Sequence, residues 1–188
     1  FKVLVNAEPD GNVFDLDLDY RAPKGGLLAS FAGTRHDTRV RLLGDGTWKK
    51  WDGALVANED GAQLAALRLY NRSGLYRISG LVWHRDYLTG LAARALGDST
   101  AIALVGTLKN SVLAGSAALR GHGVSVDADG GVDLGNNAFK NSKVQIKLVD
   151  SQLFGPGLTM RDLMIRTTLD GPWRGFSAPF SLSVGQAD

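Results

Sequence analysis

The sequence predicts an all-β protein: a long antiparallel sheet that curls into a half-tube, with an apolar interior and one short amphipathic helix. Apolar and polar residues alternate with a period of two along most of the chain. Glycine is abundant (24 residues) while proline is scarce (5 residues), and an apolar content of 44% is too high for a disordered linker. Turn-forming residues separate the alternating segments at short intervals.

The alternation is clearest at 14–20, where aromatic and leucine side chains fall on one side of a strand and three aspartates fall on the other. The segments 143–148 and 176–184 repeat this pattern. Such segments are typical of strands with one side in water and the other buried.

Further strands and the turns between them complete an antiparallel meander. Strands are expected at 1–7, 27–32, 38–43, 53–58, 63–70, 75–81, 101–108, 112–119, 123–128, 131–134 and 164–169. Turns are expected at 9–12, 45–46, 60–61, 73–74, 109–110, 129–131 and 170–172. An open sheet rarely exceeds about ten strands without curling, so a curled sheet is expected. No domain boundary is evident, and 1–188 is expected to form a single elongated β segment.

One segment departs from the period of two. Over 86–96, Leu88, Leu91 and Leu96 recur at helical spacing, and Gly97 can end a helix. A short amphipathic helix that packs on the sheet or caps one end of it is therefore expected.

Composition excludes several classes of function. The net charge is +2 with interspersed signs, which disfavours nucleic-acid binding. The chain has no cysteine, so disulfides, zinc ribbons and thiol catalysis are excluded. It shows no signal-peptide pattern, and apolar runs such as 101–105 are too short to cross a bilayer as a helix.

The residue inventory predicts a protein that is not an enzyme and has no cofactor. The three histidines, His36, His84 and His122, are far apart in sequence and match no metal or catalytic spacing. The segment 44–49 resembles a phosphate-binding loop but lacks its Gly-Lys-Ser/Thr ending, so a hairpin turn is expected there.

No metal site is expected. Asp15, Asp17 and Asp19 carry the carboxylates that calcium prefers. Side chains two apart on a strand stand roughly 7 Å from each other, too far for three of them to share one ion. A solvated outer face is the simpler interpretation.

The tryptophans are Trp48, Trp51, Trp83 and Trp173. Trp48 and Trp51 flank two lysines beside a predicted turn. Such rings either belong to the core or lie at the rim of a groove, where an indole is half in water.

The main functional signal is the apolar side of the strands. Its expected members, as lining of a groove for lipid or for a client strand, are Phe14, Leu16, Leu18, Val40, Leu42, Leu55, Leu67, Leu69, Ile78, Ile102, Leu104, Val124, Val126, Val144, Ile146, Leu148, Ile165, Phe176, Phe180 and Leu182. The alternative is that these side chains bury one another in an ordinary β-sandwich. Both arrangements remove the same apolar area from water, so area alone does not separate them.

Several segments, in this order, resemble the alphaproteobacterial TamB family, the inner-membrane subunit of the translocation and assembly module. The segment 46–55 (GTWKKWDGAL) resembles a G-x-W-x-x-W-x-G-x-L element of that family. The segments 90–97 (GLAARALG) and 131–139 (GVDLGNNAF) resemble its x-A-R-x-L-G and G-x-V-D-L-x-x-N-x-F elements. The segments 153–158 and 169–172 also agree with the pattern of that family. The part before about residue 44 resembles it only as generic β structure.

The resemblance implies a fold and a function. Members of this family, which is related to AsmA-like and bridge-forming lipid transfer proteins, form long taco-shaped β structures with an apolar interior. The implied setting is the periplasm, with the full-length protein anchored in the inner membrane and meeting the outer-membrane barrel TamA. The implied roles are phospholipid transport between the membranes and assembly of outer-membrane proteins such as autotransporters, without catalytic residues.

Two other classes remain open on the sequence. A chaperone-like module would bind nascent outer-membrane strands by β-augmentation at a free sheet edge. Pro179 indicates such an edge or a bulge, because proline cannot complete a central ladder. A secreted adhesin or passenger domain would carry repeated polar ladders and bind no lipid. Because free edges of a sheet can pair with each other, an edge-to-edge homodimer of the isolated fragment is also among the expected partners.

Overall fold

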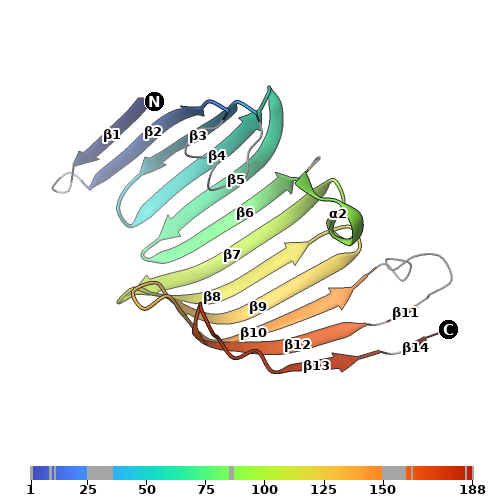
Figure 1. The fold of residues 1–188 in the computed structure, drawn as a ribbon. Helices are drawn as coiled ribbons and strands as arrows, with labels where there is room; N and C mark the ends of the chain where they lie inside the picture. The colour runs from blue at the N-terminus through green and yellow to red at the C-terminus, as the bar shows by residue number, and fades with distance from the viewer. Residues whose placement is uncertain are drawn as a thin grey trace. The chain divides into compact units, whose positions relative to one another are not determined.

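The computed structural model describes residues 2–8, 10, 12–24, 36–84, 87–149, 160–161, 163–184 and 186–187. The chain divides into two compact units, Phe1–Trp83 (unit 1) and His84–Asp188 (unit 2). Each unit is built on an antiparallel sheet, so the predicted all-β antiparallel class is confirmed (Figure 1). The prediction of a single elongated segment concerns both units together and stays a prediction.

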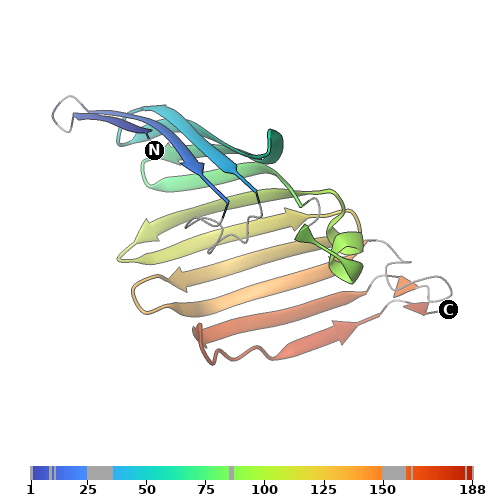
Figure 2. The ribbon, with the colours of Figure 1, turned by 45° about the horizontal axis from the view of Figure 1, so that its top comes forward.

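The strands of unit 1 follow each other in chain order, and each pairs with the next (Figure 2). They are β1 (Lys2–Glu8), β2 (Val13–Ala22), β3 (Thr38–Gly46), β4 (Lys50–Glu59), β5 (Ala62–Arg72) and β6 (Leu75–Trp83). No pairing among the described residues joins β1 to β6, so this sheet is open. The strand predicted at 27–32 lies outside the described residues.

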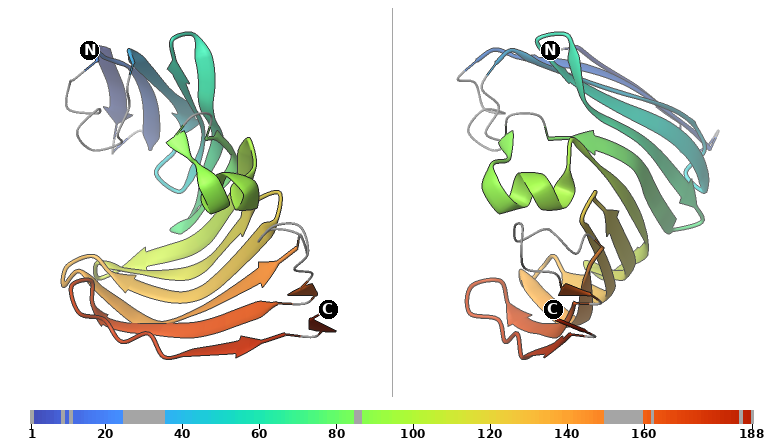
Figure 3. Two further views of the ribbon diagram at one scale, coloured as in Figure 1. Left: turned by 45° about the vertical axis from the view of Figure 1, so that its right-hand side comes forward. Right: turned by 90° about the vertical axis from the view of Figure 1, so that its right-hand side faces the viewer.

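Unit 2 repeats this arrangement and adds the helix. Its elements are α2 (Gly90–Leu96), β7 (Ser99–Lys109), β8 (Val112–Arg120), β9 (Val124–Asp133), β10 (Ala138–Leu148), β11 (Met160–Arg161), β12 (Met164–Pro172), β13 (Phe180–Ser183) and β14 (Gln186–Ala187). The main sheet runs β7-β8-β9-β10-β12-β13, and β11 pairs separately with β14. Its strands bow along their length, so this sheet is curled (Figure 3).

Two-residue turns explain why neighbouring strands in the chain become neighbours in a sheet. Asp60 and Gly61 have φ of 46° and 78°, and Ser73 and Gly74 have φ of 52° and 86°. Positive φ at both central residues is the signature of the type I′ turn, whose twist matches that of a hairpin. The turns predicted at 60–61 and 73–74 are therefore confirmed, and the one predicted at 109–110 lies one residue later, at 110–111.

The predicted helix is present but shorter than expected. It begins at Gly90 rather than at 86, and its end at Leu96 with Gly97 as the C-cap agrees with the sequence. It caps one end of unit 2, because the backbone N–H groups of His122 and Gly123 donate to its last carbonyl groups. Of the described residues in the rest of the predicted span, Tyr87 lies in a 3₁₀ turn, whereas Leu88 and Thr89 are not helical.

Three predicted turns fall inside strands. The segment 129–131 was expected to separate two strands, but β9 runs unbroken through it, because Gly130 pairs with Gly115 in the ladder. Likewise, 45–46 belongs to β3 and 170–172 to β12. At Gly46 and Gly130 glycine permits a close backbone approach, since a Cβ there would lie 2.3 Å from the Lys50 carbonyl oxygen and 2.4 Å from the Ser142 Cα.

The predicted strand at 176–184 is shorter in the structure. Only Phe180–Ser183 forms β13, and Ser177 makes an isolated bridge to Asp170. Pro179 immediately precedes β13, which is the edge strand of this sheet, in agreement with the expectation from proline.

Each sheet is a single layer with very little core. The only buried apolar residues among those described are Ala22, Val124, Ala138 and Leu163. A domain of this length normally buries most of its large apolar side chains. These sheets therefore leave much of their apolar side chain area in contact with water.

Candidate functional site

In unit 1 the cross-strand register gathers apolar side chains on one face. Leu18 lies opposite Leu42, Leu42 opposite Leu55, and Leu55 opposite Leu67. Directly opposed residues point to the same side of a sheet, and residues two apart on a strand do so as well. The predicted residues that share this side, the apolar face of unit 1, are Phe14, Leu16, Leu18, Val40, Leu42, Leu55, Leu67, Leu69 and Ile78.

The same register adds members that the sequence analysis did not single out. These are Val3, Val5, Tyr76 and Val82. Tyr20, which the alternation at 14–20 predicts, and Trp51 lie on this face as well. Their alternation was visible in the sequence, but only the pairing with known neighbours assigns them to this face. The face has polar residues at its two ends, among them Thr38 and Asn71.

The opposite face of unit 1 is mostly charged. Arg39 donates through Nε to Asp19 Oδ1 at 2.8 Å, and a second hydrogen bond from its Nη2 reaches the other oxygen. The hydrogen bond from Arg39 lowers the pKa of Asp19 to about 2, with nearby arginine charges acting in the same direction. The separation of polar from apolar residues is incomplete, because this face also carries Leu4, Leu43, Val56, Leu75 and Leu81.

In unit 2 a row of apolar residues crosses every strand of the main sheet from β7 to β13. Each member is directly opposed to the next: Ile102, Leu119, Val126, Ile146, Ile165 and Leu182. A second row contains Leu104, Val144 and Phe180, and Val124 lies opposite Leu148. All of these side chains point to one side, the apolar face of unit 2.

The remaining predicted residue, Phe176, reaches the same face from the segment before β13. Its ring makes an edge-to-face contact with Phe139 at a centroid distance of 5.3 Å. Phe139 lies opposite Val132 on β9. The register also adds members that the sequence analysis missed, namely Leu108, Leu113, Leu119, Val132, Phe139 and Leu169.

The opposite face of unit 2 pairs charges across strands. Lys143 lies opposite Asp129, and Arg120 donates through Nη2 to Asp127 at 2.5 Å. At one end Asp133 accepts hydrogen bonds from the Asn136 side chain and backbone, both at 2.9 Å. These bonds lower the pKa of Asp133, so this carboxylate stays charged to lower pH than usual.

Many apolar side chains on these faces are only partly covered. Val5 is 55% exposed, Leu104 is 43% exposed, and at the free edge of unit 2 Leu182 and Phe180 are 58% and 76% exposed. Of the predicted residues on the two faces, Val124 alone is buried. Groups of exposed apolar side chains are uncommon on the surface of a soluble monomer, so these faces are the candidate site.

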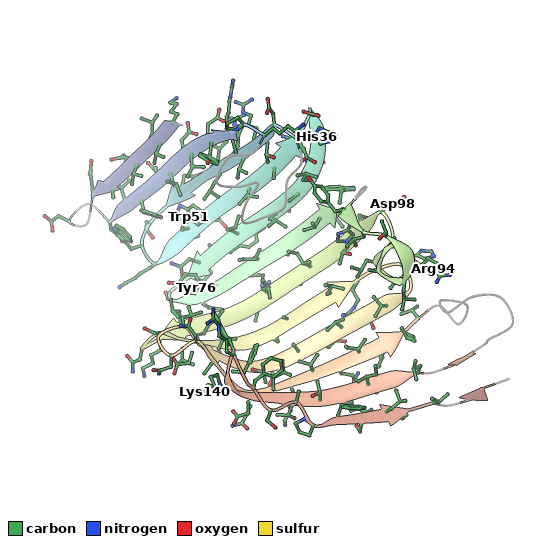
Figure 4. All side chains as sticks on the ribbon, in the orientation of Figure 1. His36, Trp51, Tyr76, Arg94, Asp98 and Lys140 are labelled. Atoms are coloured by element: carbon green, nitrogen blue, oxygen red, sulfur yellow. The ribbon has the colours of Figure 1, made fainter. Side chains whose placement is uncertain are left out.

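An aromatic cluster closes one end of the apolar face of unit 1. Phe14 stacks on Trp48 at 4.5 Å and contacts Trp51 at 6.0 Å. The Trp51 indole lies over Gly44 and Gly53, which are directly opposed. Trp51 and His36 lie at opposite ends of the strands of unit 1 (Figure 4). Because Trp48 remains 46% exposed, the cluster has the half-wet character expected of a rim.

A row of glycines crosses the apolar face of unit 2. Gly106 is opposed to Gly115, and Gly115 to Gly130. A Cβ on Gly115 would lie 2.0 Å from the Val105 carbonyl oxygen, and one on Gly130 would lie 2.4 Å from the Ser142 Cα. The neighbouring backbones therefore approach too closely for any side chain at this row.

The candidate catalytic and metal-binding residues do not come together. His36 contacts Asp60 at 2.9 Å, whereas His84 contacts Thr100 through its side chain. In the described part of the chain, no group of three or more histidine, cysteine or acidic residues could hold a metal ion. Nor is any helix found there that is long and apolar enough to cross a membrane.

Comparisons with known proteins add no identification. No protein-family model, no curated protein and no solved structure matches the chain.

Proposed function

We propose that this chain is a periplasmic segment of a TamB-like protein, whose apolar faces carry phospholipid acyl chains between the inner and outer membranes. In this proposal the full-length protein is anchored in the inner membrane, meets the TamA barrel and supports the assembly of outer-membrane proteins. The chain itself performs no chemistry and needs no cofactor. The motif order described above is the basis for the family, and the apolar faces are the basis for the cargo.

The observation that carries the proposal is the row of apolar residues that crosses every strand of a single-layered sheet. An acyl chain offers no hydrogen-bonding groups, so a surface that accepts it must satisfy its own backbone groups and present apolar side chains. A β-sheet with one apolar face does both, and burial of that face against hydrocarbon contributes about 25 cal/mol per Å².

The length of the row fits this cargo. Neighbouring strands lie about 4.8 Å apart, so the row from Ile102 on β7 to Leu182 on β13 is about 24 Å long. Half of a bilayer hydrocarbon core is about 15 Å thick. An extended acyl chain can therefore lie along the row with apolar contacts over its full length.

Photo-crosslinking from matched neighbouring positions tests the proposal. A photoreactive amino acid is placed at Leu55 or Ile146 on the apolar faces, and at Val56 or Gln145 on the opposite faces of the same strands. The protein is irradiated with vesicles of phosphatidylethanolamine and phosphatidylglycerol, and adducts are identified by mass spectrometry. Lipid adducts are expected from Leu55 and Ile146 only. Equal labelling of both faces, or none, would contradict the proposal.

A second candidate is a module that binds nascent outer-membrane strands by β-augmentation. The observation that favours it is the free edge of β13, where Phe180 and Leu182 are the most exposed residues of their rows. For this function, crosslinkers at Ser181 and Ser183 on β13 would trap polypeptide clients in an envelope extract. Positions in central strands would trap neither clients nor lipid.

A further inference from the structure

Strand β1 forms one edge of the sheet of unit 1 and is fully exposed. It pairs with β2 on one side, and no strand among the described residues pairs with its other side. All of its residues are exposed, including Leu4 and Val5 at 55% each. An exposed edge strand of this length with apolar side chains is a template for another strand.

The sequence of β1 complements itself. It carries a cation at its first position, Lys2, an anion at its last, Glu8, and no other charge between them. From these features we infer that β1 pairs with β1 of a second copy of this chain, antiparallel and centred on Val5. This register sets Lys2 opposite Glu8 of the second copy, Val3 opposite Ala7, Leu4 opposite Asn6, and Val5 opposite itself.

Side-chain direction and charge select this register over its neighbours. A shift that sets residue 4 opposite residue 5 would place the apolar face of one copy beside the charged face of the other, because side chains alternate along a strand. A shift that sets Lys2 opposite Asn6 keeps the faces aligned, but it shortens the ladder and gives Lys2 no anion on the second copy. Only the pairing centred on Val5 uses every residue of β1 and forms two ion pairs related by the two-fold axis.

The two-fold axis stands perpendicular to the sheet at Val5, so the apolar faces of both copies of unit 1 point to the same side. In this pairing Val3, Val5 and Ala7 lie opposite Ala7, Val5 and Val3 of the second copy. The apolar face, to which these residues belong, therefore continues across the interface. This inference rests on the edge of β1 alone and does not depend on lipid being the cargo.

Cysteine crosslinking tests the register without background, because the chain has no cysteine of its own. In V5C the two thiols face each other across the axis, within the Cα separation of a disulfide. Oxidation should therefore give a covalent dimer. In K2C alone the thiols are about 20 Å apart, so no dimer should form, whereas an equal mixture of K2C and E8C should crosslink. A dimer from K2C alone, or none from V5C, would overturn the inference.

Charge reversal tests the same contacts without covalent chemistry. K2E and E8K each place like charges at both ends of the ladder, and each should raise the dimer dissociation constant about tenfold in analytical ultracentrifugation. The double variant K2E/E8K restores opposite charges and should recover wild-type association. It also controls for the effect of K2E on Asp19, which is opposite Lys2 within the chain. A monomeric wild-type chain at near-millimolar concentration, or a double variant as weak as K2E, would refute the pairing.

Discussion

The indole ring of Trp51 occupies the space above Gly44, and a Cβ on Gly44 would lie 2.0 Å from Cζ2 of that ring. The two residues belong to paired strands, where Gly46 is opposed to Trp51 and Gly44 to Gly53. The Trp51 ring lies flat on the sheet because Gly44 and Gly53, which are opposed, have no side chains to cover the backbone of the sheet there. The contact also holds Trp51 within reach of Phe14.

The substitution G44V should displace the Trp51 ring. Overpacking of this kind costs about 1–3 kcal/mol of unfolding free energy, which denaturant titration measures. A54V is the matched control, because Ala54 is exposed on the opposite face of β4 and its substitution should change stability by less than about 0.5 kcal/mol. In a W51A background, G44V should cost clearly less than in the wild type. Equal costs in both backgrounds would show that the two residues are not coupled.

The Asp19–Arg39 pair should make unit 1 sensitive to acid. The pKa of Asp19 is lowered to about 2 in the folded chain, from about 3.9 for an unperturbed aspartate. Its contribution to stability is therefore complete above pH 4 and is lost as the pH falls from about 4 to about 2. D19N should show a shallower fall in unfolding free energy over that window than the wild type. An NMR titration that gives Asp19 an ordinary pKa would contradict this prediction.

The substitution G115A should destabilise unit 2 more than an ordinary surface change does. Its Cβ would meet the Val105 carbonyl oxygen and the Gly106 Cα, which are backbone atoms and cannot rotate away. A loss of about 1–3 kcal/mol is expected, measured by thermal or denaturant unfolding. G135A is the control, since a Cβ there meets only ordinary contacts at 3.5 Å. If G115A is as stable as G135A, the close backbone contacts at Gly115 do not exclude a side chain.

Polar substitutions at the most exposed apolar positions should leave stability nearly unchanged. F180S and L182S remove side chains that the protein covers poorly, so the unfolding free energy should move by about 0.5 kcal/mol or less. The same variants should bind an apolar fluorescent dye less well than the wild type. A loss of several kcal/mol would mean instead that these side chains serve packing within the chain.

Much of the fold follows from the alternation of residue types. The segment 14–20 predicts both the existence of β2 and which of its sides is apolar, because a period of two fixes side-chain direction once a strand forms. The turns at 60–61 and 73–74 follow from residues that tolerate positive φ. Local chemistry is sufficient for features of this kind.

The features that were missed depend on neighbours that the sequence does not reveal. Gly130 lies in a segment whose residue types are typical of a turn. It nevertheless continues β9, because Gly115 and Ser142 come close to it on either side. Membership of Phe139 in the apolar face depends on a bulge in β10 that shifts the register between Lys140 and Lys143. Neither the partner strand nor the bulge can be read from one segment alone.

In unit 1 every strand pairs only with the strands beside it in the chain, and the main sheet of unit 2 departs from this order only where β10 pairs with β12. Contacts are therefore short-range in sequence, and the stability of each sheet is close to a sum of hairpin contributions rather than a property of one central core. Such a sheet loses order from its edges inward, one hairpin at a time, and a strand near the middle can persist after its outer neighbours have melted. Hydrogen exchange along unit 1 would then rise from β3 and β4 toward β1.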